Sequence, residues 1–412
     1  MAGLNETPSS NRLHIGIFGK TNSGKSSFIN ALTGQATSIV ADVAGTTTDP
    51  VYKAMEIHPL GPCVLIDTAG FNDNTVLGQK RLDKTREAAS KCDIAVIVFD
   101  ASTLYLDNSW DISSELEWYK ALLEQNTPVL LVLNKTDLCT PSQLEECIVH
   151  ISEAFNNKHT ELVAISSTSL QEQDLAQVKA ALTRLLPEEY GTEFITGSLV
   201  SEDDLVLLVM PQDIQAPKGR LILPQVQTIR ELLDKKCLVV SVTTDKLTTV
   251  LPLLNQPPKL IITDSQVFDF VYQHKPTESM LTSFSVLFAA YKGDLPYYIE
   301  GAKAIDSLTE SSRVLIAECC THAPLTEDIG TVKIPAMLRK RIGQGLTIDH
   351  VRGTDFPDSP TDYDLIIQCG ACMFNKKYVL SRIQKAKDAH IPMTNYGVTI
   401  AHVTGILDKI SY

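Results

Sequence analysis

The stretch GKTNSGKS at residues 19–26 constrains the fold of this 412-residue chain more than any other feature. It follows the apolar run LHIGIF (13–18), which has strand character, and precedes SFINALTG (27–34), which has helical periodicity. A strand, a Gly-rich loop and a helix in this order are the context of a Walker A phosphate-binding loop. Gly19 and Gly24 let backbone N–H groups point at phosphate oxygens, and the helix N-terminus adds its dipole. We therefore predict an N-terminal nucleotide-binding domain.

The side chains of this loop have separate predicted roles. Lys25 is placed to reach the β- and γ-phosphates, and Ser26 is placed to ligate Mg²⁺. We expect Ser23, Gly24 and Ser27 to contact the phosphates as well. The loop thus predicts a nucleoside triphosphate and Mg²⁺ as ligands.

Short apolar runs rich in Val and Ile alternate with helix-length segments over the first part of the chain. Such alternation is typical of a parallel sheet covered by helices on both faces. The helical stretch 171–189 closes the series, so we predict a P-loop domain of Ras-like α/β fold over residues 1–188. The runs after the first lie at 63–66, 94–99, 129–133 and 162–165.

A second α/β series follows, and we assign it to a domain over residues 189–276. Its apolar runs lie at 204–210, 237–242 and 259–265. At about 80 residues this domain is too small for a large core and is expected to need a partner surface. The polar stretch 273–279 is predicted to form a hinge to the third part of the chain.

A third α/β domain is predicted over residues 277–412, which makes three domains in all. It contains the helical stretch 376–390 (KKYVLSRIQKAKDAH). Its apolar runs lie at 283–290, 313–317, 364–367 and 394–400.

Composition narrows the class of protein. The net charge of −13 argues against sequence-independent binding of nucleic acid, which needs a basic surface. No apolar run reaches the roughly 18 residues of a membrane span, and the N-terminus has no apolar signal core, so we expect a cytoplasmic protein. Nine cysteines in such a chain are expected to be reduced thiols. Five scattered cysteines are expected to pack in cores: Cys63, Cys92, Cys139, Cys147 and Cys237.

Further motifs indicate that the nucleotide is GTP. Asp67 and Gly70 are the first and last residues of the sequence DTAG, which fits a switch near Mg²⁺ and the γ-phosphate. Asn134, Lys135 and Asp137 belong to NKTD, in which the Asp carboxylate accepts two hydrogen bonds from guanine that adenine does not offer. The sequence therefore predicts GTP and GDP as ligands.

Two further positions complete this set. Thr47, in the AGTTTD sequence at 44–49, is the candidate switch threonine for the Mg²⁺ shell. Ser166 begins Ser-Ser-Thr, which only partly matches the Ser-Ala-Lys that usually supports the guanine site.

These motifs resemble the TrmE–Era–EngA branch of GTPases. The resemblance implies that Asn22 helps to hold K⁺ against the phosphates, where the cation would offset charge in the transition state. Phe71 follows DTAG where Ras-like proteins have a catalytic Gln. We therefore expect slow GTP hydrolysis that K⁺ stimulates, with Asn22, Lys25, Thr47 and Asp67 as the catalytic set.

Three cysteines far along the chain form a second candidate site. Cys320 follows the run at 313–317, and Cys369 and Cys372 follow the run at 364–367. Both groups thus stand at carboxyl ends of predicted parallel strands, where α/β sheets place ligands. Three thiolates with an open fourth position suit a [4Fe–4S] cluster, while a structural zinc site or cysteines without metal remain alternatives.

At these cysteines the chain closely resembles the HydF family, over essentially its whole length. The segments that carry the resemblance are CTH at 320–322, CGAC at 369–372, and 216–233, 262–268, 281–295, 301–308, 328–335 and 394–402. The resemblance implies a GTPase that carries a [4Fe–4S] cluster and a diiron precursor and delivers the precursor to apo [FeFe]-hydrogenase. It implies two radical-SAM maturases as further partners, a homodimer formed by the middle domain, and an anaerobic cytoplasm.

The chain departs from the family pattern at one position. Gln368 stands where the family has a His before CxxC, so the fourth iron site is expected to be held by solvent, a carboxylate or His322. Cys319 is out of register with CxH and is expected to pack in the core. The competing hypothesis is a GTPase with a structural zinc domain that acts in RNA modification or ribosome assembly.

Overall fold

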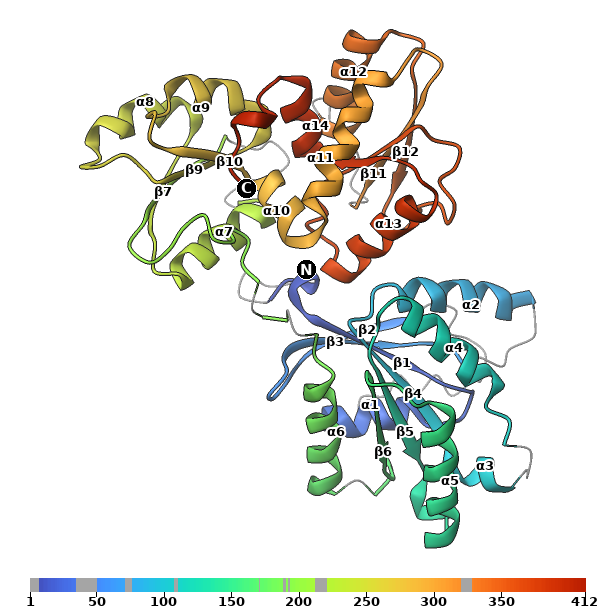
Figure 1. The fold of residues 1–412 in the computed structure, drawn as a ribbon. Helices are drawn as coiled ribbons and strands as arrows, with labels where there is room; N and C mark the ends of the chain where they lie inside the picture. Colours follow the sequence, from blue (N-terminus) through green and yellow to red (C-terminus); the bar gives the residue numbers. More distant parts are fainter. Residues whose placement is uncertain are drawn as a thin grey trace. The chain divides into compact units, whose positions relative to one another are not determined.

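The computed structural model describes residues 7–34, 50–70, 76–106, 110–169, 171–187, 190–191, 193–211, 221–319 and 328–412. The chain divides into two compact units, Met1–Tyr190 and Gly191–Tyr412. Both are built from sheets and helices, as the predicted α/β class requires (Figure 1). None of the helices in the described part combines the length and apolar character needed to cross a membrane.

The first unit contains a six-stranded sheet in the order β2-β3-β1-β4-β5-β6. All pairings are parallel except that of β2 with β3, which is antiparallel. Each of the five apolar runs in the first part of the sequence forms a strand. The strands are β1 (Leu13–Phe18), β2 (Val51–Ile57), β3 (Gly61–Asp67), β4 (Ile94–Asp100), β5 (Val129–Asn134) and β6 (Thr160–Ala164).

Helices cover both faces of this sheet, and each face has its own apolar core. One core joins the sheet to α1 (Lys25–Thr33) and α6 (Glu172–Arg184). The other joins it to α2 (Val76–Ala89), α4 (Ser113–Glu124) and α5 (Pro141–Ala154). The strands between them are therefore apolar on both faces, which is the reason for their nearly unbroken Val and Ile runs. The short α3 spans Ala101–Leu106.

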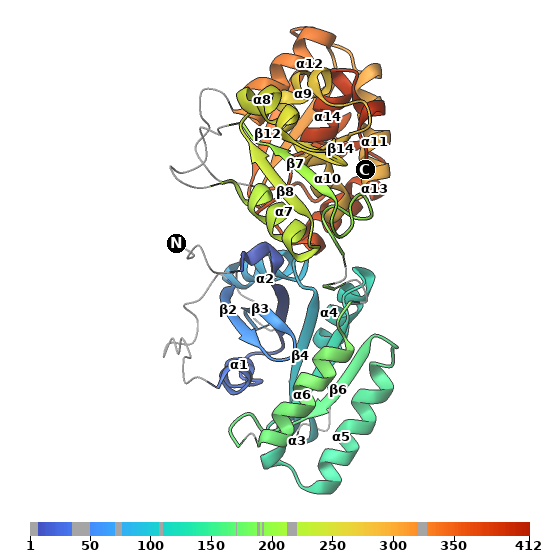
Figure 2. The ribbon, with the colours of Figure 1, turned by 90° about the vertical axis from the view of Figure 1, so that its left-hand side faces the viewer.

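The second unit holds two four-stranded sheets, and both are wholly parallel (Figures 1 and 2). The first sheet contains β7 (Leu205–Val209), β8 (Leu238–Val242), β9 (Leu260–Thr263) and β10 (Met280–Ser283), with α7 (Leu223–Asp234), α8 (Leu247–Val250), α9 (Phe268–His274) and α10 (Phe284–Lys292). The second contains β11 (Arg313–Glu318), β12 (Thr347–Arg352), β13 (Leu365–Gln368) and β14 (Met393–Asn395), with α11 (Leu295–Lys303), α12 (Ile334–Ile342), α13 (Lys376–Asp388) and α14 (Tyr396–Val403).

These two sheets repeat one topology. If the strands of each sheet are numbered 1 to 4 along the chain, the sheet β12-β11-β13-β14 has the order 2-1-3-4. The sheet β10-β9-β7-β8 has the same order when it is read from β8 to β10. The registers also correspond, because Val206 pairs with Leu260 in one sheet as Val314 pairs with Leu365 in the other. The unit is therefore an internal structural duplication.

The match continues into the helices that follow the fourth strands. Ser283 Oγ accepts a hydrogen bond from the N–H of Val286 at 3.2 Å and caps α10. Asn395 Oδ1 accepts one from the N–H of Val398 at 2.8 Å and caps α14. The sequences around the two caps, TSFSV and TNYGV, show only weak similarity, which explains why the repeat is hard to find from the sequence.

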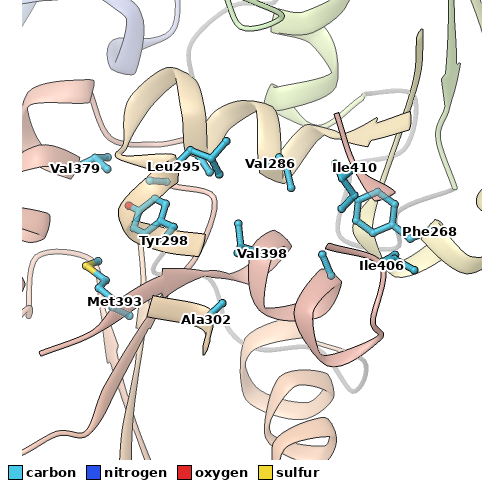
Figure 3. Packing of buried hydrophobic residues seen from close by; sticks show 14 of the residues in the cluster. Phe268, Val286, Leu295, Tyr298, Ala302, Val379, Met393, Val398, Ile406 and Ile410 are labelled. Atoms are coloured by element: carbon cyan, nitrogen blue, oxygen red, sulfur yellow. The ribbon is translucent and has the colours of Figure 1, made fainter. Parts of the chain in front are cut away.

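A shared core joins the two sheets. It contains Leu207 and Val209 of β7 together with Leu315 and Ala317 of β11. Figure 3 shows Val286 of α10 and Val398 of α14 among the side chains packed there, and Figure 1 places both helices between the sheets. The two expected C-terminal domains thus form one compact unit.

Two features of the second unit depend on contacts that the sequence pattern does not show. The expected boundary at residue 276 precedes β10, which completes the first of the two sheets by pairing with β9. The apolar run 283–290 forms most of α10, and the run 394–400 is divided between β14 and α14. Short apolar runs fit a buried helix as well as a strand, so their secondary structure depends on the packing of both sheets.

Candidate functional site

The phosphate loop joins β1 to α1 and depends on glycine at two positions. Gly19 has φ 144°, and a Cβ there would lie 2.4 Å from the carbonyl oxygen of Val98. Gly24 has φ 94°, and a Cβ there would lie 2.1 Å from Asn134 Nδ2. Asn22 also has positive φ, at 64°. The loop conformation therefore excludes side chains at Gly19 and Gly24, as the P-loop pattern predicts.

Lys25 is held inside the loop. Its Nζ donates hydrogen bonds to the carbonyl oxygens of Gly19 at 3.1 Å and Lys20 at 2.9 Å. Burial lowers the pKa of Lys25 to about 8, and the negative charge of Asp67 acts in the opposite direction. A buried ammonium with only carbonyl partners is suited to an anionic ligand.

Asp67 ends β3 beside the first residues of α1. Ser26 Oγ donates a hydrogen bond to Asp67 Oδ2 at 3.3 Å. Burial raises the pKa of Asp67, while Lys25 and the Ser26 hydrogen bond lower it. Gly70 lies so close to the phosphate loop that a Cβ there would stand 2.4 Å from Thr21 Oγ1. The structure thus brings the two candidate Mg²⁺ side chains, Ser26 and Asp67, together.

The NKTD residues connect the phosphate loop with the loop after β6. Asn134 Nδ2 donates to the carbonyl oxygen of Ser23 at 3.0 Å, and Asn134 Oδ1 accepts from the N–H of Ser167 at 3.0 Å. Lys135 has φ 62°, and its Nζ lies 2.5 Å from Asp100 Oδ2. Asn134 is therefore a cross-link between three loops at the carboxyl edge of the sheet.

Ser166 supports the candidate guanine reader. Its Oγ donates to Asp137 Oδ1 at 2.6 Å, so the weak Ser-Ser-Thr match does supply a partner for that carboxylate. Sequence reasoning missed Ser167 and Asp100, because one acts through its backbone N–H and the other carries no motif. Thr47 and Phe71 lie outside the described residues.

We expect Ser166→Ala to weaken GTP binding about tenfold. The variant removes a hydrogen bond to a carboxylate, worth about 1.5 kcal/mol. Titration with a fluorescent GTP analogue would measure the change, and Ser169→Ala, on an exposed neighbour, serves as the control. Unchanged affinity in Ser166→Ala would mean that this hydrogen bond does not hold Asp137 for the base.

The cysteine site lies at the carboxyl edge of the β11–β14 sheet. The N–H of Cys319, just after β11, donates to Cys369 Sγ, just after β13, at 3.1 Å. The thiol of Cys319 and the N–H of Ala371 also donate to this sulfur, and together these hydrogen bonds lower the pKa of Cys369. Burial and the same contact raise the pKa of Cys319. The arrangement favours a thiolate at Cys369.

Cys372 stands between this sulfur and the start of α13, whose N-cap is Asn375. Lys292 Nζ donates to the carbonyl oxygens of Cys372 at 3.5 Å and Phe374 at 2.8 Å. Both Cys369 and Cys372 are partly exposed, whereas Cys319 is buried in the core, where we expected it. Of the scattered cysteines, only Cys139 is not buried.

The residues present fit an iron–sulfur cluster in one respect, since N–H donors to a cysteine sulfur are a usual feature of such sites. Within the described residues, no three His, Cys, Asp or Glu side chains form a group that could hold a metal ion. Cys320 and His322 lie outside those residues, so their predicted roles are not tested.

Gln368 is buried at the end of β13, with 1% of its surface exposed. Its Nε2 is 3.5 Å from the hydroxyl oxygen of Tyr298 on α11, a weak hydrogen bond. Tyr298 is also fully buried, and burial raises its pKa. The residue that replaces the family His therefore has a partner within the core.

Together, the phosphate loop, the DTAG residues and the cross-linked NKTD motif define the first unit as a P-loop GTPase domain. A family model described as a 50S ribosome-binding GTPase matches residues 14–135. Models described as the hydrogen maturase F dimerization domain and tetramerization domain match residues 195–293 and 296–411. The chain belongs to the hydrogen maturase F (HydF) family of hydrogenase maturation GTPases.

Curated relatives share only part of the chain. It is 36% identical over 181 residues to GTPase Der of Wolinella succinogenes, which covers 43% of this chain and 36% of the relative. It is 39% identical over 131 residues to the tRNA modification GTPase MnmE of Endomicrobium trichonymphae, which covers 31% and 27%. The chain thus spans about a third of the length of these relatives.

Among solved structures, that of Aquifex aeolicus Era bound to GDP and AlF4⁻ is similar to this chain. The match covers 65% of this chain and 99% of the Era chain, with 18% sequence identity and a TM-score of 0.37.

Proposed function

We propose that this protein is a GTP-hydrolysing carrier that binds a [4Fe–4S] cluster and a diiron precursor and delivers the precursor to apo [FeFe]-hydrogenase. The observation that carries the proposal is the hydrogen-bonded sulfur of Cys369, which lies with Cys372 in the segment that matches the hydrogen maturase F tetramerization domain. Radical-SAM maturases are the proposed source of the precursor.

Three cysteines, Cys320, Cys369 and Cys372, are the proposed ligands of the cluster. A cluster with three protein thiolates has one iron that can accept and release a ligand, and His322 is a candidate for that position. This chain supplies the thiolates, the N–H donors that stabilise Cys369, and the edge of the sheet that holds both.

GTP is proposed to control partner exchange through the switch segments, with Mg²⁺ held by Ser26, Thr47 and Asp67. Lys25 would neutralise the phosphates, and Asn134, Lys135, Asp137 and Ser166 would select guanine. Nothing in this role requires the nucleotide to contact the iron.

The assembly is proposed to be a dimer or a higher oligomer, in line with the descriptions of the two C-terminal family models. Three functional regions are proposed within the chain: GTP binding over 1–188, dimerisation over 189–276, extended by β10, and cluster binding over 277–412. An anaerobic cytoplasm would suit the transfer of a labile precursor.

Anaerobic reconstitution with iron and sulfide tests the proposal. We expect about one reducible cluster per chain, seen as an EPR signal after reduction, with four iron atoms for each cluster. The alternative, a GTPase with a structural zinc domain in RNA modification or ribosome assembly, predicts stoichiometric zinc instead. Zinc content of one per chain with no EPR signal would exclude the carrier.

Potassium dependence tests the assignment of Asn22. We expect GTP hydrolysis to be about tenfold faster in KCl than in NaCl, because K⁺ at the phosphates offsets charge in the transition state. In Asn22→Ala this difference is expected to disappear, while Asn126→Ala, which also has positive φ but lies after α4, should keep it. A wild-type rate that is the same in both salts would show that Asn22 holds no K⁺.

A further inference from the structure

Two buried cations flank the segment of the cysteine site that runs from Cys372 to Phe374. Lys292, the last residue of α10, is 2% exposed and donates to the carbonyl oxygens of Cys372 and Phe374. Arg382, on α13, is 1% exposed, and its guanidinium carbon lies 4.7 Å from the centre of the Phe374 ring. The same three-residue segment is thus held by one cation at its backbone and by the other at its side chain.

Neither cation has a carboxylate partner among the residues that the structure describes. Lys292 Nζ donates to carbonyl oxygens, and Arg382 Nη2 donates to the carbonyl oxygen of Gly353. Arg382 Nε and Nη1 are buried without a hydrogen-bond partner. The guanidinium is otherwise enclosed by aromatic rings, those of Phe356 at 5.0 Å, Phe374 at 4.7 Å and Tyr378 at 5.1 Å.

Such an arrangement is costly unless an anion completes it. A buried charge is normally paired, and an unpaired one destabilises the folded protein. Lys292 Nζ lies at the backbone of Cys372, and the guanidinium of Arg382 lies against the ring of Phe374, two residues further along the chain. Both cations therefore lie beside the segment where the thiolate ligands of a bound cluster would bring negative charge.

We propose that Lys292 and Arg382 are positioning residues that form a cationic seat for an anionic cluster bound at Cys369 and Cys372, and that they raise its reduction potential. The inference rests on the proposed cluster-carrying function. A cluster with thiolate ligands is negative and gains one further negative charge on reduction, so two nearby positive charges favour the reduced form. At an effective dielectric constant of about 20, one cation within about 8 Å changes the reduction equilibrium by at least about tenfold.

The test compares neutral and charge-conserving variants of the full chain after anaerobic reconstitution. Lys292→Gln and Arg382→Gln remove one charge each, whereas Lys292→Arg and Arg382→Lys keep it. EPR-monitored redox titration is expected to show a midpoint potential that is about 59 mV more negative in each neutral variant. This shift corresponds to about a tenfold change in the reduction equilibrium constant for one electron. The charge-conserving variants are expected to lie close to the wild type. Lys385→Gln, on the same helix as Arg382 but ion-paired with Asp358 at the surface, is the matched control.

A second measurement separates charge from packing. Thermal unfolding of each variant is followed with and without the cluster, and the rise in Tm on loading is expected to be smaller in the neutral variants than in the wild type. A purely structural role would lower both Tm values equally, or abolish folding of the cluster-free variants, and either result would overturn the proposal. An unchanged midpoint potential in both neutral variants would also overturn it.

A neutral variant that folds but cannot be loaded with the cluster gives a further comparison. Loading of the charge-conserving variant at the same position then supports the cationic seat, and failure of both variants to load contradicts it. Absence of a cluster in the wild type would instead refute the proposed function.

Discussion

Replacement of Cys369 by serine is expected to abolish binding of the iron–sulfur cluster. The sulfur of this residue accepts hydrogen bonds from the thiol of Cys319, from the N–H of Ala371 and from the N–H of Cys319 at 3.1 Å, and these donors lower its pKa. A serine hydroxyl is far less acidic than a thiol, so it would not supply the anion that binds iron. Because loss of outer-shell partners alone weakens metal binding by about 10- to 100-fold, we expect loss of a ligand to exceed about 100-fold.

Iron analysis and EPR of the anaerobically reconstituted protein measure this effect. Cys372→Ser is expected to behave in the same way, whereas Cys237→Ser is the control. Cys237 lies in the same unit but is buried beside the carbonyl oxygen of Ser201, at 3.2 Å, away from the cysteine site. A full complement of reducible cluster in Cys369→Ser would show that this cysteine is not a ligand.

Lys25→Met is expected to weaken GTP binding by about 30- to 3,000-fold. The ammonium of Lys25 is buried at the start of α1, and its hydrogen bonds within the described residues go to the carbonyl oxygens of Gly19 and Lys20 in its own loop. Removal of a buried charge that pairs with phosphates costs about 2–5 kcal/mol, which corresponds to this range. Methionine has a similar length, so the change isolates the charge from the packing of the loop.

Isothermal titration with GTP and Mg²⁺ measures the loss, and GTP hydrolysis is expected to fall with it. Lys120→Met, at an exposed position on α4 of the same unit, controls for the lower net positive charge. If Lys25→Met bound GTP within threefold of the wild type, Lys25 could not be the main phosphate ligand.

Motifs with fixed spacing were predictable because their geometry is local. The glycines at 19 and 24 are required by close contacts with the backbone of Val98 and the side chain of Asn134, and the strand before the loop is apolar on both faces. The same holds for the Ser26–Asp67 pair, because both residues lie at the carboxyl edge of neighbouring parallel strands. These parts of the GTPase domain follow from pattern and topology alone.

Other features depend on contacts between residues far apart in the chain. The ion pair of Lys135 with Asp100 and the hydrogen bond from the N–H of Ser167 to Asn134 join motif residues to partners that no motif specifies. The duplication of the two C-terminal sheets is visible in strand register, but scarcely in the sequence. The polar stretch that suggested a boundary at residue 276 lies just before β10, which pairs with β9 in the same sheet.

The sequence by itself determined that this protein has a P-loop GTPase domain and belongs to the HydF family, because short motifs with characteristic spacing and longer matching segments identify both. Only the tertiary structure decided that Cys319 supports Cys369, that Gln368 pairs with Tyr298, and that Lys292 and Arg382 lie beside the cysteines. The reason is that burial and charge pairing arise when separate helices and strands pack together, and no spacing along the chain encodes them.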